Sequence, residues 1–264
     1  MTYTVGIAGL GAIGLAVARA IDLGIPGLRL QAVCVRTPDR RVADFRQPPD
    51  FVDFAALANC DIVVEAAPAA VFEQIAGPAI ASGRIFVPSS VGALLPRMYL
   101  VEQAKRTGAR IIVPTGALLG LDAVRAAAEG EVDSITIETR KPPTGLVGAP
   151  YLTEHGIDVL SIRQPTVIFE GNALDAAAGF PANVNVAAAL ALAGIGPLRT
   201  TVKIWADPGV DRNIHTIRLE SSAARLTMTV ENVPSEANPR TGKLTPLSVI
   251  ACLRGLTSTL KVGS

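Results

Sequence analysis

The stretch Tyr3–Gly14, which reads YTVGIAGLGAIG, decides the fold of this chain. It begins as a short apolar run typical of a buried strand and ends in a G-x-G-x-x-G pattern that leads into residues with helical spacing. In a strand–turn–helix context this pattern predicts a dinucleotide-binding turn. Gly9 permits the tight turn, Gly11 lets the backbone approach a pyrophosphate at the helix N-terminus, and Gly14 lets the helix pack closely on the strand.

Beyond this stretch, apolar runs continue to alternate with helical patterns. They predict strands at residues 3–8, 30–35, 61–66, 84–87 and 110–113, and helices at 12–23, 68–82 and 95–107. Continuous Val- and Ile-rich runs separated by helices are typical of a parallel sheet covered on both faces. With right-handed crossovers, the first third of the chain is therefore predicted to form a Rossmann-like doubly wound sheet.

The remainder of the chain has a different pattern, in which apolar and polar residues alternate within the strands. It predicts strands at 132–140, 165–170, 200–206, 214–220 and 225–231, and helices at 119–130, 183–193 and 245–256. Such alternation is typical of antiparallel strands with one solvated face. The expected fold class is α/β, with a second α+β domain of mostly antiparallel sheet. We expect residues 1–117 to bind the dinucleotide, residues 118–240 to bind substrate and form oligomer contacts, and the final helix within 241–264 to pack back on the first domain.

The composition excludes several classes of protein. Of the 264 residues 49% are hydrophobic and 18% charged, with a net charge of +1, as expected for a compact globular protein. No basic stripe or aromatic run indicates nucleic-acid binding. The longest apolar stretch, 184–195, is shorter than the roughly 20 residues that span a membrane, and the N-terminus lacks the basic region of a signal peptide. Three scattered cysteines argue against a disulfide framework or a metal site and favour a reducing cytoplasm.

The choice between NAD and NADP depends on residues at the carboxyl ends of the strands. The second strand ends without the acidic residue that binds a ribose 2′-hydroxyl. Arg36 and Thr37 stand there instead, so Arg36 either binds the 2′-phosphate of NADP or stacks on the adenine of either cofactor. Small residues after the strand 61–66 either let the chain pass close to a ribose or nicotinamide or form an ordinary turn. The sequence thus predicts NAD or NADP, with these candidate ligands: Gly9, Gly11, Ala12, Ile13, Arg36, Ala66 and Pro68.

The segment Trp205–His215, WADPGVDRNIH, is the strongest candidate for chemistry. His215 is one of two histidines, and it lies where a turn-rich run opens an alternating strand. An imidazole in that position suits a general acid/base near neutral pH. A partly buried histidine with a purely structural hydrogen bond fits the same pattern. If the residue is catalytic, Asp207 and Asp211 are candidates to orient its ring. An aspartate at a strand end before a proline is equally typical of an ordinary turn.

Taken together, the motifs of the chain resemble those of the L-aspartate dehydrogenase family. The resemblance covers essentially the whole chain, and its motifs are specific in combination although each is modest alone. They are GLGAIG (Gly9–Gly14), EAAP (Glu65–Pro68), SSVGAL (Ser89–Leu94), PTGALLGLDA (Pro114–Ala123), KPP (Lys141–Pro143), FPANVNVAAALALAG (Phe180–Gly194), ADPGVDRNIHTI (Ala206–Ile217) and NPRTGKLTPLSVIACLR (Asn238–Arg254).

The resemblance implies an NAD(P)-dependent enzyme that oxidatively deaminates L-aspartate through iminosuccinate, or reductively aminates oxaloacetate with ammonia. It also implies a homodimer or higher homo-oligomer in the cytoplasm, of the type linked to NAD biosynthesis. The family's catalytic histidine falls on His215, and its nicotinamide-side contacts fall near Ala123 and Asn185.

A dicarboxylate substrate requires cations or amide donors. Among residues in predicted loops we favour Lys141, Asn213 and Arg240, with Arg212 and Thr241 as further candidates. Asn183 and Asn185 stand out as polar positions of an otherwise apolar predicted helix, and buried amides need partners. Either they contact cofactor or substrate, or Asn183 is a simple N-cap.

Two other functions fit the same pattern. The nearer is another NAD(P)-dependent reductase of small carboxylates, such as a homoserine dehydrogenase-like or dihydrodipicolinate reductase-like enzyme. The farther is a non-catalytic dinucleotide sensor, which binds nucleotide without turnover. Fold alone does not decide between them.

Overall fold

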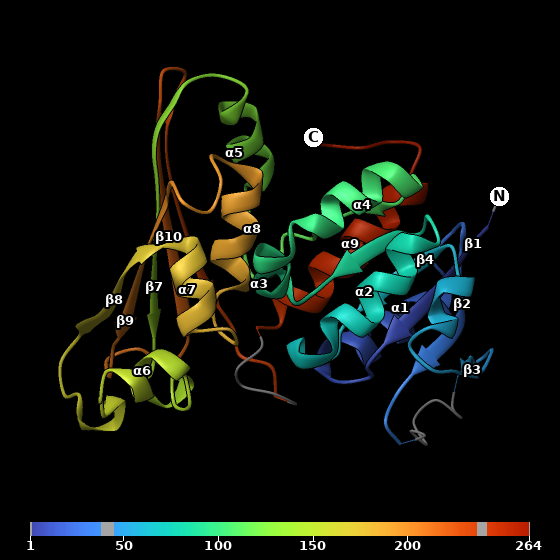
Figure 1. The fold of residues 1–264 in the computed structure, drawn as a ribbon, viewed down its shortest axis with the longest axis horizontal. Coiled ribbons are helices and arrows are strands. Elements are labelled where there is room, and N and C mark those ends of the chain that lie inside the picture. The colour runs from blue at the N-terminus through green and yellow to red at the C-terminus, as the bar shows by residue number, and fades with distance from the viewer. Residues whose placement is uncertain (1, 38–44, 237–241, 264) are drawn as a thin grey trace. The chain divides into compact units, whose positions relative to one another are not determined.

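The computed structural model describes residues 2–37, 45–236 and 242–263. The chain forms two compact units (Figure 1). The first comprises Met1–Pro114 together with Thr245–Lys261, and the second comprises Thr115–Leu244 together with Val262–Ser264.

The first unit is built on a six-stranded sheet in which every observed pair is parallel. The strand order is β3-β2-β1-β4-β5-β6, so the order reverses between β1 and β4. That reversal is the switch point at which doubly wound sheets bind ligands. The strands are β1 (Tyr3–Ala8), β2 (Leu28–Cys34), β3 (Asp50–Phe51), β4 (Ile62–Glu65), β5 (Ile85–Pro88) and β6 (Arg110–Ile111).

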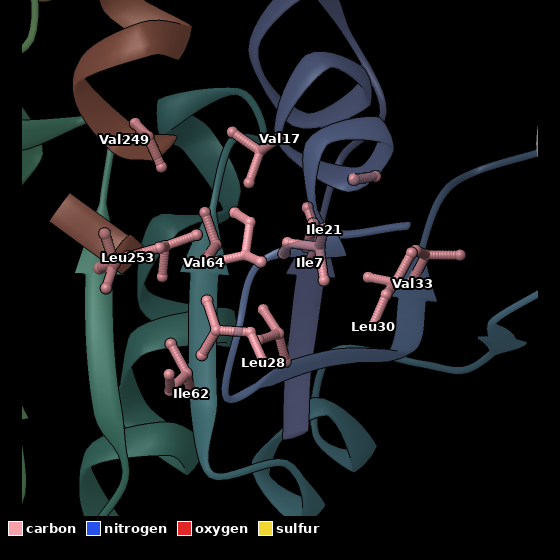
Figure 2. Packing of buried hydrophobic residues seen from close by; sticks show 14 of the residues in the cluster. Ile7, Val17, Ile21, Leu28, Leu30, Val33, Ile62, Val64, Val249 and Leu253 are labelled. Atoms are coloured by element: carbon pink, nitrogen blue, oxygen red, sulfur yellow. The ribbon is translucent and has the colours of Figure 1, made fainter. Parts of the chain in front are cut away.

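Helices cover both faces of this sheet. They are α1 (Ala12–Gly24), α2 (Phe72–Ala81), the single turn α3 (Val91–Leu94), α4 (Tyr99–Thr107) and α9 (Leu244–Thr257). Figure 2 shows Val249 and Leu253 of α9 beside Val17 of α1 and Val64 of β4, all within one buried cluster. On the other side, Phe72 of α2 packs edge-on against Phe86 of β5, with ring centroids 5.7 Å apart.

The second unit contains a five-stranded sheet in the order β11-β10-β7-β9-β8. Three of its four strand pairs are antiparallel, and only β7 and β9 run parallel. The prediction of a mostly antiparallel second sheet is thus confirmed. Its strands are β7 (Val132–Lys141), β8 (Thr166–Asn172), β9 (Thr200–Ala206), β10 (Asn213–Ser221) and β11 (Arg225–Asn232), and its helices are α5 (Leu121–Ala128), α6 (Pro150–Glu154), α7 (Ala173–Gly179) and α8 (Asn185–Ala193).

The two faces of the second sheet differ in character. Alternate residues of β7 from Ile135 to Lys141 are buried, and a Cβ added at Gly194, directly after α8, would meet Ile135. This face therefore lies against the helices. The opposite face is polar; there Arg218 of β10 pairs with Glu138 of β7 at 2.5 Å.

Several predicted elements differ at their ends. The predicted helix 119–130 begins only at Leu121, because Gly120 adopts a φ of +72° at the N-cap. Within the predicted helices 68–82 and 95–107, residues Ala69–Val71 and Leu95–Arg97 form tighter 3₁₀ turns, and the α-helices begin only after them. The predicted strand 110–113 pairs only at its first two residues.

Three short helices, α3, α6 and α7, and the two-residue strand β3 were not predicted. Each has too few residues for an apolar repeat to be recognised. The N-cap of α7 is Asn172, a residue type that favours this position. Its side chain accepts hydrogen bonds from the backbone N–H groups of Leu174 and Asp175.

Candidate active site

The glycine turn between β1 and α1 has the geometry that its sequence predicts. Gly9 has a φ of +88°, and a Cβ there would lie 2.6 Å from the carbonyl oxygen of Ala66. A Cβ at Gly14 would lie 1.9 Å from the carbonyl oxygen of Gly9. Both contacts are far inside van der Waals distance, so only glycine fits at either position.

Gly11 is different, because a Cβ added there would meet no atom within 4 Å. It is the N-cap of α1, and Ala12 and Ile13 form the first turn behind it. The N–H groups of a first helical turn have no partner within the helix, and together with the helix dipole they bind anions. The open space beside Gly11 at the start of α1 fits a dinucleotide pyrophosphate, and Gly9 and Gly14 permit the tight turn that leads into the helix.

The neighbouring strand ends are held by a buried carboxylate. Glu65, the last residue of β4, has no solvent exposure and accepts hydrogen bonds from the backbone N–H groups of Ala67, Ser89 and Ser90 at 2.8–3.1 Å. The Ser90 hydroxyl donates a fourth at 2.9 Å. Burial raises the pKa of Glu65, and these hydrogen bonds oppose that effect. The carboxylate thereby ties the loop after β4 to the loop after β5.

The other cofactor candidates of this unit are accessible. Ala66 is half-buried, and Pro68 is exposed directly after the Glu65 strand end. Arg36 is exposed two residues beyond the end of β2. All three lie in segments that follow the carboxyl ends of parallel strands, where such sheets bind ligands.

In the second unit, His215 of β10 stands opposite Thr139 of β7 in the antiparallel register. Its Nδ1 lies 3.0 Å from the Thr139 Oγ1. The residue is only 3% exposed, and this burial, aided by the positive charge of Lys141, lowers the pKa of His215 to about 3. The imidazole is therefore neutral at physiological pH.

Lys141 was predicted in a loop, and that placement is wrong. It is the last residue of β7, two positions beyond Thr139 on the same face, and is 5% exposed. Its Nζ donates a 2.7 Å hydrogen bond to the Oδ1 of Asn183. Asn183 does not cap α8, since the N-cap is Val184 and no side chain caps the helix. The structure thus brings together two residues that the sequence singled out separately.

Neither predicted aspartate orients the imidazole. The Asp207 carboxylate is bound by Arg140 at 3.2 Å and by the backbone N–H of Gly209 at 2.9 Å. Asp211 pairs with the adjacent Arg212 at the surface. Thr139, and not an aspartate, lies beside the imidazole. The sequence contains a signal for this, because the buried face of the strand carries Ile at 135 and 137 but Thr and Lys at 139 and 141, so polar side chains stand at its end.

The other candidate residues of the second unit that the structure describes are half-buried. Asn213 was also predicted in a loop, but it is the half-buried first residue of β10, opposite Asn232. Ala123 is half-buried in α5, and Asn185 is the half-buried first residue of α8. Arg240 and Thr241 lie outside the described residues.

The described part of the chain offers no cluster of metal-ligating side chains and no helix that could span a membrane. No group of three or more His, Cys, Asp or Glu side chains there is arranged to hold a metal ion. Across residues 2–37, 45–236 and 242–263, no helix combines the length and the apolar character that crossing a membrane requires.

The chain combines a doubly wound unit that contains a dinucleotide turn with an α+β unit that contains a buried histidine and lysine. This combination is typical of two-domain nicotinamide-dependent dehydrogenases. Residues 122–256 match the family model for the C-terminal domain of aspartate dehydrogenase, and residues 9–114 match that for the NAD-binding domain of homoserine dehydrogenase. The chain belongs to the aspartate dehydrogenase family.

Individual relatives are similar in sequence or structure to nearly the whole chain. The L-aspartate dehydrogenase of Bradyrhizobium diazoefficiens is 52% identical, with 98% of this chain and 94% of that protein covered. L-aspartate dehydrogenase 3 of Bordetella bronchiseptica is 49% identical, with 98% and 97% covered. The crystal structure of aspartate dehydrogenase from Thermotoga maritima has a TM-score of 0.76 at 27% identity and covers 100% of both chains. The likeness to homoserine dehydrogenase is thus confined to the cofactor domain.

Proposed function

We propose that this protein interconverts L-aspartate with oxaloacetate and ammonia, using NAD or NADP. The observation that carries the proposal is the cluster at the end of β7: a neutral imidazole, His215, and a buried ammonium group, Lys141, on the same face of one sheet. The family's L-aspartate dehydrogenases support the choice of substrate.

The glycine turn is the proposed binding site for the cofactor. Gly9 and Gly14 shape the turn, Gly11 leaves room for the pyrophosphate, and the first-turn amides at Ala12 and Ile13 face it. When bound, the nicotinamide supplies the hydride acceptor or donor. Ala66, Pro68 and Arg36 are proposed contacts of the same site, and Ala123 and Asn185 are proposed to contact the nicotinamide side.

His215 is the proposed group at the reacting carbon. In the aminating direction ammonia adds to the carbonyl carbon of oxaloacetate and the oxygen leaves as water, so protons move between nitrogen and oxygen. A neutral imidazole serves such steps by hydrogen-bonding to the oxygen or by exchanging a proton with the nucleophile. Burial keeps the ring neutral.

Lys141 is the proposed partner of a substrate carboxylate. Its ammonium is buried and anchored by Asn183, so its position is fixed before substrate binds. An ion pair formed in a buried site is stronger than one at the surface. Asn213 and Arg240 are proposed to complete the recognition of the dicarboxylate.

We also infer self-association and a cytoplasmic location. The polar face of the second sheet, opposite its helices, is the surface we propose for contacts between copies, and it includes Trp205 with the Arg140 guanidinium 4.1 Å above its ring. The cysteines Cys34, Cys60 and Cys252 are free thiols, which supports a reducing compartment. Light scattering of the purified protein tests the association; a strictly monomeric protein would exclude it.

Substrate screening tests the proposed activity. We expect the absorbance of NADH or NADPH to fall when oxaloacetate and ammonium are both present, and to stay constant when ammonium is omitted. Turnover of homoserine without turnover of aspartate would support the small-carboxylate alternative. Tight nucleotide binding without turnover of either would support the sensor.

A further inference from the structure

Thr139 and His215 form a hydrogen-bonded pair on the helix-covered face of the second sheet, the face that also carries Lys141. They are cross-strand neighbours of β7 and β10, are 4% and 3% exposed, and their side chains meet at 3.0 Å between Oγ1 and Nδ1. The strand neighbours on one side of the pair, Ile137 and Ile217, are fully buried, and those on the other side, Lys141 and Asn213, are polar. On the apolar side no alternative polar partner comes from those positions, and on the other side the Lys141 ammonium donates a hydrogen bond to Asn183.

Counting hydrogens assigns the direction of this hydrogen bond. A threonine hydroxyl has one hydrogen to donate, and among the described residues the Thr139 hydroxyl has no side-chain hydrogen-bond partner other than His215. Leaving a buried donor unsatisfied is costly. An N–H on Nε2 can be satisfied by a ligand or by water, whereas the hydroxyl hydrogen has no acceptor other than Nδ1 among these residues, so the hydroxyl donates to Nδ1. Because burial and Lys141 keep the ring neutral, its single proton lies on the other nitrogen, Nε2.

Nε2 is the nitrogen left for a ligand. It makes no hydrogen bond within the described part of the chain. Among the described residues, the fully buried side-chain atoms without a hydrogen-bond partner are Ser89 Oγ, Trp205 Nε1 and Asn232 Oδ1, and Nε2 is not one of them. The ring is thus fixed on one side by Thr139 and retains access on the other.

We propose that Thr139 is a positioning residue that holds His215 in the tautomer with its proton on Nε2, so that the imidazole meets the substrate as a hydrogen-bond donor. A donor at this position suits a carbonyl oxygen or a developing oxyanion, and not an ammonium group. The role toward substrate rests on the proposed function, whereas the tautomer does not.

The residue type at position 139 matters because a carboxylate there would act differently. Asp or Glu beside Nδ1 would stabilise the imidazolium and favour a proton on Nδ1. A hydroxyl has no charge, so it orients the ring and leaves it neutral. The arrangement thus favours hydrogen-bond donation by a neutral imidazole over proton storage on an imidazolium.

Nitrogen NMR of protein labelled with ¹⁵N-histidine tests the tautomer directly. The chain has two histidines, and the His155→Asn variant identifies the signals of His215. At neutral pH we expect Nε2 protonated and Nδ1 unprotonated in the wild type, with this preference weakened in Thr139→Val and retained in Thr139→Ser. A wild-type ring protonated on Nδ1 would overturn the proposal, and this result does not depend on any variant at position 139.

Kinetics test the consequence for catalysis. Thr139→Val should lower kcat about tenfold or more, the effect of losing roughly 1.4 kcal/mol of orientation, with KM for the cofactor unchanged. Thr139→Ser should restore most of the rate. The matched control is Thr216→Val, which removes a hydroxyl bonded to Thr229 on the opposite face of β10 and should leave kcat unchanged.

The two tests separate the possible failures. An enzyme that does not act on aspartate but shows the Nε2 proton would sink the proposed function and keep the positioning role of Thr139. An active enzyme with the proton on Nδ1, or equal rates in the wild type and Thr139→Val, would sink the positioning role alone.

Discussion

Replacing His215 by Asn should make the free energy of unfolding of this protein less dependent on pH below pH 7. The wild-type imidazole is buried and neutral in the folded chain, with a pKa of about 3 against an ordinary value of 6.5. On unfolding the ring meets water and regains the ordinary value. Between these two pKa values the unfolded chain binds a proton that the folded chain does not, so acid favours unfolding.

The magnitude follows from linkage. The stabilising effect of the neutral ring is fully present above the unfolded pKa and is lost as the pH falls toward the folded one. The loss approaches about 1.4 kcal/mol per pH unit in that window. Between pH 7 and pH 5 the wild type should lose about 2 kcal/mol of unfolding free energy through His215 alone. Asparagine does not titrate, so the variant lacks this loss.

Urea unfolding of both proteins at pH 5, 6, 7 and 8 measures the effect. The carboxylates are common to both, so the difference in unfolding free energy between wild type and variant isolates the His215 contribution. His155→Asn, which removes the exposed histidine, is the matched control and should follow the wild type. A wild-type-minus-variant difference that stays constant from pH 8 to pH 5 would refute the reasoning, because the ring would then have the same proton affinity folded and unfolded.

Three further predictions concern the two binding regions. Gly14→Ala should lower the free energy of unfolding by at least about 3 kcal/mol, because its Cβ would lie 1.9 Å from the Gly9 carbonyl oxygen. Gly11→Ala should keep the wild-type free energy of unfolding but bind NADH at least about tenfold more weakly. Thermal unfolding and nucleotide titration check this pair, and equal stability losses in both would contradict it. Lys141→Met should raise KM for oxaloacetate about tenfold or more with the NADH affinity intact, since the buried cation is lost; an unchanged KM would remove Lys141 from the site. Arg36→Gln should weaken NADPH binding about tenfold and spare NADH, as for a 2′-phosphate ligand; equal losses for both nucleotides would instead indicate stacking on adenine.

Much of the fold was predictable because its strands have simple periodicities. The buried runs in β1 and β4 and the alternation in β7 and β10 reflect burial on two faces or on one. What the sequence did not predict depends on short local geometry. Helices α6 and α7 are too short for periodicity, and Gly120 delays the start of α5 by a backbone conformation that spacing does not report.

The candidate site was predicted in part for a related reason. His215 and Lys141 were recognisable as residues, but their environment depends on which strands pair. The register of β7 with β10 puts Thr139 beside His215, although 76 residues separate them in sequence. Asp207 and Asp211 are nearer in sequence, and that proximity was misleading, because both carboxylates are bound by arginine.

The most direct test of the account is the rate of nicotinamide oxidation with oxaloacetate and ammonium, compared between wild type and His215→Asn. We predict ammonium-dependent oxidation by the wild type and a loss of about a hundredfold or more in the variant, with NADH binding unchanged. A variant that keeps the wild-type rate would contradict the central claim that the buried imidazole of His215 serves the reaction.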